Sequence, residues 1–280
     1  MPTPEGILVA RPRPADGGAR LVWRTVTIVA AVLTAFLDPS IGAAAPVAVR
    51  FSEGVSRGFL VLMTPDGTAI AHGELHQKPT GGRIESRLFL IFKDGSRYDE
   101  TVVFSQKGVF RLESYRLVQR GPSYPVTDVA FDRSTGRYRA RTQAKKDDAE
   151  KVASGTFDMP PDLYNGMALT LIKNLPAGAG TIGQLVAFLP EPRLIKMEIA
   201  PEGEDRAHVA GERQAVTRYR VKFDIGGLTG IVASLIGKDP PELRYWVVPG
   251  AVPAFARFEG AMYINGPVWR LEMVPVRFDK

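Results

Sequence analysis

The stretch YDETVVFSQKGVFRLESYRLVQ, residues 98–119, decides the fold class of this chain. Two runs rich in β-branched and aromatic residues flank the dipeptide Lys107-Gly108. Two such runs around a short glycine-containing turn predict a β-hairpin. If Lys107-Gly108 forms a two-residue loop, Asp99 faces Arg116 across the hairpin and the two side chains form an ion pair.

Both faces of this predicted hairpin carry apolar residues. With the two-residue loop, one face holds Val103, Phe110 and Leu112. The other face holds a second apolar set with polar residues, among them Glu100, between its members: Val102, Phe104, Val109, Tyr115 and Leu117. An antiparallel sheet that is wetted on one side usually alternates more cleanly. We therefore expect either that helices cover the second face or that something apolar is held there.

The same alternation of strand-like runs and turns extends through most of the chain. Turn signals such as Pro65-Asp66-Gly67 and Asp94-Gly95-Ser96 separate short strand-like runs. We expect strands at residues 59–63, 69–77, 83–93, 98–106, 109–119, 126–132, 137–143, 181–189, 193–200, 214–225, 243–248, 255–264 and 268–278. Short strands at such spacing favour an antiparallel meander. The prediction is a mainly β fold, a barrel, half-barrel or curved sandwich with one or two packed helices.

Two segments have helical spacing. Residues 161–175 place Leu163, Met167 and Leu171 on one stripe behind Pro160 and Pro161, a pattern typical of an amphipathic helix.

The charged run at 145–151 between strands is predicted to be a hairpin tip.

The second helical segment, residues 226–237, carries no charge. Leu228, Ile231 and Leu235 follow helical spacing within it. One interpretation is a helix buried against the sheet or closing one end of a barrel. The other is an apolar lid over a ligand cavity, which would make these three residues ligand-binding.

The N-terminal residues have the pattern of a secretory signal. Four arginines precede an uncharged apolar run at residues 25–37, and small residues follow up to Ala45. Basic, apolar and small-residue regions in that order are typical of a signal peptide, and about 13 apolar residues are too few to span a bilayer as a helix. We predict a signal peptide at 1–44 and one β-rich domain at 45–280, exported to the periplasm or the extracellular space. An uncleaved membrane anchor is the alternative.

Composition and motifs exclude several classes of function. The chain has no cysteine, so thiol catalysis and thiolate metal sites are excluded. Its 36 basic and 30 acidic residues are interspersed, unlike the clustered basic stripe of nucleic-acid-binding proteins. The one Gly-x-Ser-x-Gly run, residues 54–58, is followed by the strand expected at 59–63 and not by the helix that a nucleophile elbow requires. His208 lies in a charged stretch that we expect to be a loop. We expect no cofactor, and no catalytic residue is assigned.

The run IAHGELHQ, residues 70–77, raises the question of a metal site. On a strand His72, Glu74 and His76 point to one face, but the two histidines are then about 13 Å apart along the backbone. One ion with bonds of about 2 Å cannot gather all three without bending the strand. The favoured interpretation is the solvated side of an alternating strand, and a metal site of low affinity is the alternative.

Four runs carry a resemblance: FKDGSRYDETVVFSQ, LVQRGPSYP, MPPDLYNG and GPVWRLEM. With them the chain resembles a group of exported bacterial proteins of β-rich architecture for which no activity is known to us. More loosely, the arrangement looks like the half-barrel carriers of lipoproteins. The resemblance implies a β-rich exported protein and carries over no functional residue.

Three functions follow from these patterns. The leading hypothesis is a non-enzymatic binding module for an apolar or lipid-like, amphiphilic ligand, because a barrel-like sheet with apolar residues on both faces can enclose one. The second is a metal-dependent enzyme or metal-binding protein that uses the strand at 70–77. The third is a structural envelope protein.

Overall fold

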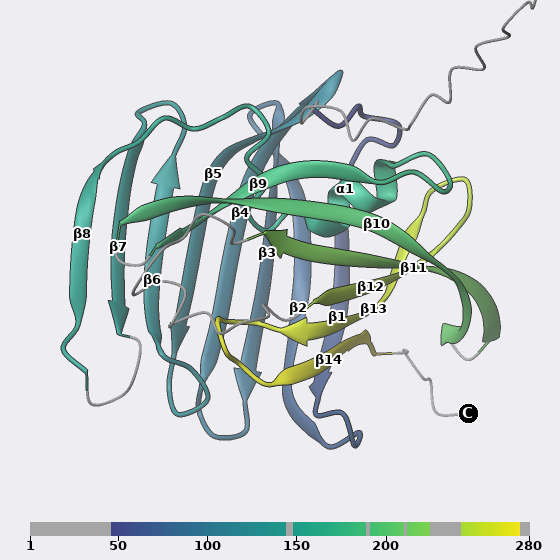
Figure 1. The fold of residues 1–280 in the computed structure, drawn as a ribbon. Coiled ribbons are helices and arrows are strands. Elements are labelled where there is room, and N and C mark those ends of the chain that lie inside the picture. Colours follow the sequence, from purple (N-terminus) through teal and green to yellow (C-terminus); the bar gives the residue numbers. More distant parts are fainter. Residues whose placement is uncertain (1–45, 144–147, 189–190, 210–211, 225–241, 275–280) are drawn as a thin grey trace, which may run out of the picture. The chain divides into compact units, whose positions relative to one another are not determined.

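A computed structural model describes residues 46–143, 148–188, 191–209, 212–224 and 242–274. Their strands form one antiparallel sheet in the order β8-β7-β6-β5-β4-β3-β2-β1-β14-β13-β12-β11-β10-β9 (Figure 1). The elements are β1 (Ser56–Met63), β2 (Ala69–Thr80), β3 (Arg83–Phe92), β4 (Arg97–Lys107), β5 (Val109–Arg120), β6 (Val126–Asp132), β7 (Arg137–Gln143), β8 (Lys151–Thr156), α1 (Ala168–Asn174), β9 (Thr181–Phe188), β10 (Pro192–Val209), β11 (Glu212–Asp224), β12 (Leu243–Val248), β13 (Ala254–Ala261) and β14 (Val268–Met273). The predicted mainly β, antiparallel class is confirmed.

The sheet consists of two meanders joined at the first and last strands. From β1 to β8 each strand pairs with the next, and from β9 to β14 the same holds, while β14 pairs with β1. The single long crossing, from β8 to β9, contains α1. Because β8 and β9 have one neighbour each among the described strands, the sheet is open, which makes it a half-barrel.

The sheet curves so that β9 and β10 lie across the face of β4, β5 and β6 (Figure 1). The rings of Phe131 on β6 and Phe188 on β9 are 6.2 Å apart, and Tyr138 on β7 is 5.5 Å from Phe188. The two ends of the sheet therefore meet through side chains instead of hydrogen bonds.

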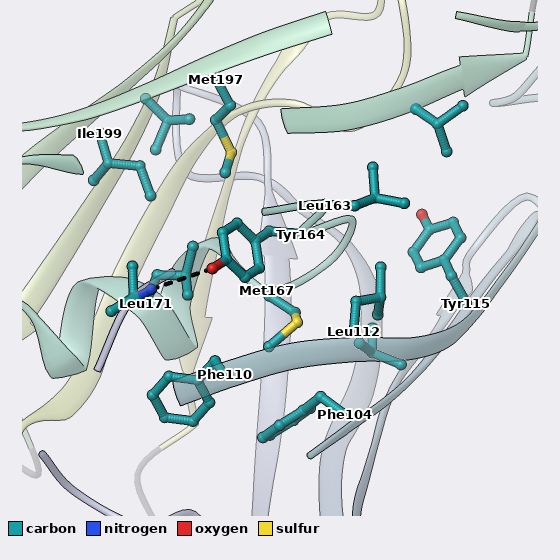
Figure 2. Close-up of a cluster of buried hydrophobic side chains, with 14 of the residues drawn as sticks. Phe104, Phe110, Leu112, Tyr115, Leu163, Tyr164, Met167, Leu171, Met197 and Ile199 are labelled. Atoms are coloured by element: carbon teal, nitrogen blue, oxygen red, sulfur yellow. Dashed lines mark hydrogen bonds between the residues drawn. The ribbon is translucent and has the colours of Figure 1, made fainter. Parts of the chain in front are cut away.

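The main hydrophobic cluster fills the space between these layers and α1. Figure 2 shows Tyr164 at its centre, with Met197 and Ile199 of β10 on one side and Phe104 and Phe110 on the other. All five side chains are buried. Burial of such apolar surface is the main stabilising contribution to folding.

The free edge of β9 is covered by the residues that precede α1. The backbone of Tyr164 donates to the Gln184 carbonyl over 2.8 Å, and Gln184 donates to the Asp162 carbonyl over 2.8 Å. The Asn165 side chain then pairs with both backbone groups of Val186, over 2.8 and 2.9 Å. Covering an edge in this way removes a template for pairing with another chain.

The predicted helix at 161–175 is shorter than expected, since α1 begins only at Ala168. Leu163 is extended, in a parallel bridge with Gln184, and Gly166 has φ +69°, a left-handed conformation that glycine adopts readily. The backbone groups that a first helical turn would use are committed to β9 instead. Leu163, Met167 and Leu171 are nevertheless all fully buried, so the apolar pattern predicted their burial and not their conformation.

The register of the hairpin at 98–119 also differs from the prediction. At the turn Gln106 already faces Phe110, and a β-bulge between Val103 and Phe104 shifts the pairing once more, so Asp99 faces Val118 and Thr101 faces Arg116. The predicted Asp99–Arg116 pair is therefore wrong. Asp99 instead accepts two hydrogen bonds from Arg87 of β3, over 2.8 and 2.6 Å.

Two further expectations need correction. The charged stretch around His208, expected to be a loop, lies in β10, where Glu204, Asp205 and Arg206 pair with β11. No bounds were predicted for strand β8, which follows the hairpin tip expected at 145–151. The sequence-predicted helix at 226–237 lies outside the described residues.

The segment just before β1 is part of this fold. Val47 is buried, and its carbonyl accepts from the Phe110 backbone over 2.9 Å. The Asn174 side chain at the end of α1 accepts hydrogen bonds from the backbone of Arg50 over 2.9 Å and of Phe51 over 2.7 Å. These bonds tie α1 to the chain that enters β1.

Candidate ligand cavity

A cavity of about 400 Å³ lies between α1 and the inner face of the sheet. Every described strand except β6, β7 and β8 contributes to its wall, as do the residues around Tyr164 and the start of α1. Most of the lining side chains are apolar, with Leu60, Leu88 and Phe258 as examples. A volume of roughly 300–1,000 Å³ with a mostly apolar wall is typical of small-molecule sites.

One carboxyl group lies in this apolar wall, that of Glu100. The Tyr115 hydroxyl donates a hydrogen bond to its Oε1 over 2.8 Å, and Tyr98 is its second hydrogen-bonding partner. The side chain is enclosed by protein and keeps accessible surface where it borders the cavity. No other acidic and no basic residue is among the described residues that line the cavity.

The titration of this group follows from its surroundings. Burial raises the pKa of Glu100, because the charged form loses hydration, and the hydrogen bonds from Tyr115 and Tyr98 lower it in part. Burial and the nearby Glu100 charge together raise the pKa of both tyrosines well above the usual range. The tyrosines are therefore neutral hydrogen-bond donors at neutral pH.

The strand pattern explains why these groups meet. Tyr98, Glu100 and Val102 alternate along β4 and so share its inner face. On β5 the bulge brings Tyr115 opposite Val102 and Leu117 opposite Glu100. Without the extra residue, Tyr115 would point to the outer face.

Gly166 allows the chain before α1 to approach this carboxyl group closely. A Cβ atom at this position would lie 2.6 Å from Cγ2 of Val102 and 3.2 Å from Cδ of Glu100. Together with its positive φ, this leaves glycine as the residue that fits.

The sequence-predicted metal candidates lie elsewhere, on the outer face of β2. His72 and His76 are exposed, and Glu74 accepts a hydrogen bond from Arg57 over 2.6 Å. Within the described ranges no three histidine, aspartate or glutamate side chains gather in a way that could hold a metal ion. His72 and Glu74 border only a shallow hollow with Phe59, Phe89 and others.

The candidate ligand-binding residues Leu228, Ile231 and Leu235 lie outside the described residues, so their role stays a prediction. Sequence reasoning placed Glu100 on a partly apolar strand face but did not select it. The available signal was an acidic residue between Tyr98 and Val102 on one face of a strand.

Comparison with known proteins adds one fold-level likeness. No family model matches the chain, and no curated protein matches it. Among solved structures, the chain is similar to a β-barrel-like protein of the domain of unknown function DUF1849 from Brucella abortus, with a TM-score of 0.41 and 10% sequence identity. The likeness covers 85% of this chain and 100% of that chain.

The β-rich architecture expected from the sequence resemblance is confirmed by the sheet itself, whereas export and a carrier role stay predictions. No helix within the described ranges is long and apolar enough to cross a membrane.

Proposed function

We propose that this protein is an exported, non-enzymatic binding protein that holds an apolar or amphiphilic ligand in the cavity beneath α1. The observation that carries the proposal is the cavity of about 400 Å³ with its largely apolar wall. Native interiors are close-packed and contain few voids larger than a water molecule. An apolar cavity of this size that the protein's own side chains leave unfilled is typical of a ligand site.

The open sheet supports the same proposal. A closed barrel of small radius fills its interior with side chains, whereas here the strands at the two ends of the sheet, β8 and β9, are not paired with each other. The inner faces of β1–β5 and β9–β14 therefore enclose both a packed core and a space.

The test is binding of an uncharged, environment-sensitive naphthalene fluorophore. The wild-type protein should enhance its fluorescence saturably. Ala187→Trp, on β9 in the cavity wall, should weaken binding at least about tenfold by filling the space. The matched control is Ala130→Trp on β6, whose cross-strand neighbours Arg116 and Arg139 are both exposed, and it should bind as the wild type does.

If Ala187→Trp does not fold, as judged by circular dichroism, Ala261→Phe in the β13 part of the wall replaces it. Absence of saturable binding to the wild type would overturn the proposal. Equal binding by the cavity variant and the Ala130→Trp control would do the same.

A further inference from the structure

The cavity wall has a strong charge asymmetry. Glu100 is its single acidic residue among those described, and none of the described lining residues is lysine, arginine or histidine. Glu100 also takes part in none of the ion pairs found among the described residues. A carboxylate taken out of water without a cation is costly, so its presence needs a reason.

The hydrogen bonds from two tyrosine hydroxyls favour the charged form of Glu100 and offset part of the cost of its burial. These donors are the hydroxyls of Tyr115 and Tyr98. Tyr245 also lies near Glu100, whose charge helps to raise the pKa of this tyrosine. Tyr98, Tyr115 and Tyr245 all line the cavity beside it. A carboxylate among tyrosine rings is a chemical setting that attracts organic ammonium groups, through charge and through the ring faces.

The same arrangement disfavours an anionic ligand. A fatty-acid carboxylate beside Glu100 would place two like charges together in a medium of low polarity. Repulsion of anionic ligands by Glu100 would thus add to its attraction of cationic ligands, and both would contribute to selectivity.

We propose that the ligand is a cationic amphiphile with a single amine or quaternary ammonium head group, which pairs with the Glu100 carboxylate while its apolar chain lies along the cavity. This inference rests on the proposed function and adds the chemical class of the ligand. Glu100 is the specificity-determining residue, and Tyr98 and Tyr115 are positioning residues that hold its carboxylate.

The experiment compares three ligands of one chain length below their micelle concentrations: dodecylammonium, dodecanol and dodecanoate. Each displaces the uncharged naphthalene fluorophore from the full protein at about neutral pH. The wild type should bind dodecylammonium at least about tenfold more tightly than dodecanol, and dodecanoate least tightly. In Glu100→Gln the ratio of the first two dissociation constants should fall to near one. In the control Glu74→Gln, on the outer face of β2, the wild-type ratio should persist.

A second arm uses only the wild type, so it does not depend on the folding of a variant. Dodecyltrimethylammonium keeps its charge at every pH. Between about pH 7 and about pH 4 it should lose affinity as Glu100 is protonated, relative to dodecanol. The other titratable groups facing Glu100 are Tyr98, Tyr115 and Tyr245, which stay neutral throughout this range because their pKa values are raised.

The outcomes separate this inference from the proposed function. Equal binding of all three ligands, a preference for dodecanoate, or a preference for dodecylammonium that survives in Glu100→Gln would overturn the inference and leave the binding function intact. Failure of every ligand and of the fluorophore to bind would overturn the function itself.

Discussion

At the scale of single residues, partners across the sheet are set by register. Asp99 faces Val118 on β5, and its partner is Arg87 on β3, which donates two hydrogen bonds to it over 2.8 and 2.6 Å. Arg116 pairs with Asp128 of β6 instead, over 3.5 Å. One inserted residue in β5 thus decides which charges meet.

The first prediction tests this pairing on the exposed face. A double-mutant cycle of Arg87→Ala and Asp99→Ala, followed by urea unfolding, should give a coupling free energy of roughly 0.2–1 kcal/mol. The matched cycle of Arg116→Ala and Asp99→Ala should give additive losses, since these residues are not partners. Coupling in the second cycle and none in the first would support the register with a two-residue Lys107-Gly108 loop.

The second prediction concerns the titration of Glu100. Burial raises its pKa in the folded state above that of the unfolded chain, so the native state binds this proton more tightly. By linkage, the charged Glu100 lowers the free energy of unfolding at pH values above its folded-state pKa. This destabilisation is relieved as the pH falls from the folded-state pKa toward the lower pKa of the unfolded chain.

Glu100→Gln should therefore exceed the wild type in unfolding free energy at neutral pH by more than it does at mildly acidic pH. Urea unfolding of both proteins over this pH range measures the difference. If the difference in unfolding free energy between Glu100→Gln and the wild type does not change with pH, the raised pKa of Glu100 is contradicted.

At the scale of elements, the sequence predicts strands better than it predicts the segment around α1. Residues 126–132, 137–143 and 243–248 form strands with the expected bounds, because turn residues on both sides mark their ends. The extent of strand β8, which follows the expected hairpin tip at 145–151, was not predicted because its residues, KVASGT, have no apolar alternation and are mostly exposed. The helix was overextended because periodicity reports burial, whereas hydrogen bonds to β9 decide the conformation of Leu163.

The bulge in β5 left a trace in the sequence. Phe110 and Leu112 share a face with Phe104, and after the bulge Tyr115 and Leu117 continue that face. The apolar period of two slips by one residue between Leu112 and Tyr115. Assigning the slip required knowing that both halves face the same interior, which only the assembled sheet shows.

The third prediction concerns the attachment of α1 to the chain before β1. Asn174 is 1% exposed and accepts from two backbone groups, those of Arg50 and Phe51, while its own Nδ2 donates to the Thr170 carbonyl over 2.9 Å. Asn174→Ala would leave the two donors without their acceptor. The unfolding free energy should fall by roughly 2–4 kcal/mol, measured by urea denaturation.

The control for that prediction is Asn174→Asp. A carboxylate still accepts both backbone hydrogen bonds but cannot donate to Thr170. It should therefore retain more stability than Asn174→Ala at neutral pH. Equal losses in the two variants would indicate that packing, and not acceptance by Oδ1, is what Asn174 contributes.

At the scale of the whole molecule, fold and site differ in how far the sequence determines them. The fold class follows from many local turns and from the alternation of apolar and polar residues, and each of these patterns can be recognised independently in the sequence. The cavity needs contributions from β1 to β5, from β9 to β14 and from α1, which no local pattern brings together. The sequence shows Glu100 on a strand, but it does not show that the described residues lining the cavity beside Glu100 include no basic residue.

The last prediction joins the proposed export to the fold. The described chain before β1 is built into the core: Val47 is 7% exposed, its carbonyl pairs with Phe110, and its backbone N–H donates to the Tyr164 hydroxyl over 3.2 Å. A cleavage site after Ala44 keeps all these contacts, and a site beyond Phe51 would remove them together with both backbone bonds to Asn174. N-terminal sequencing of the protein from its native host should therefore find a mature end near Ala45. In purified form, residues 45–280 should unfold at a distinctly higher urea concentration than residues 52–280, by the equivalent of several hydrogen bonds of about 1 kcal/mol each. Equal stability of the two chains would show that this segment does not hold α1, and an intact Met1 in a soluble cytosolic fraction would refute export.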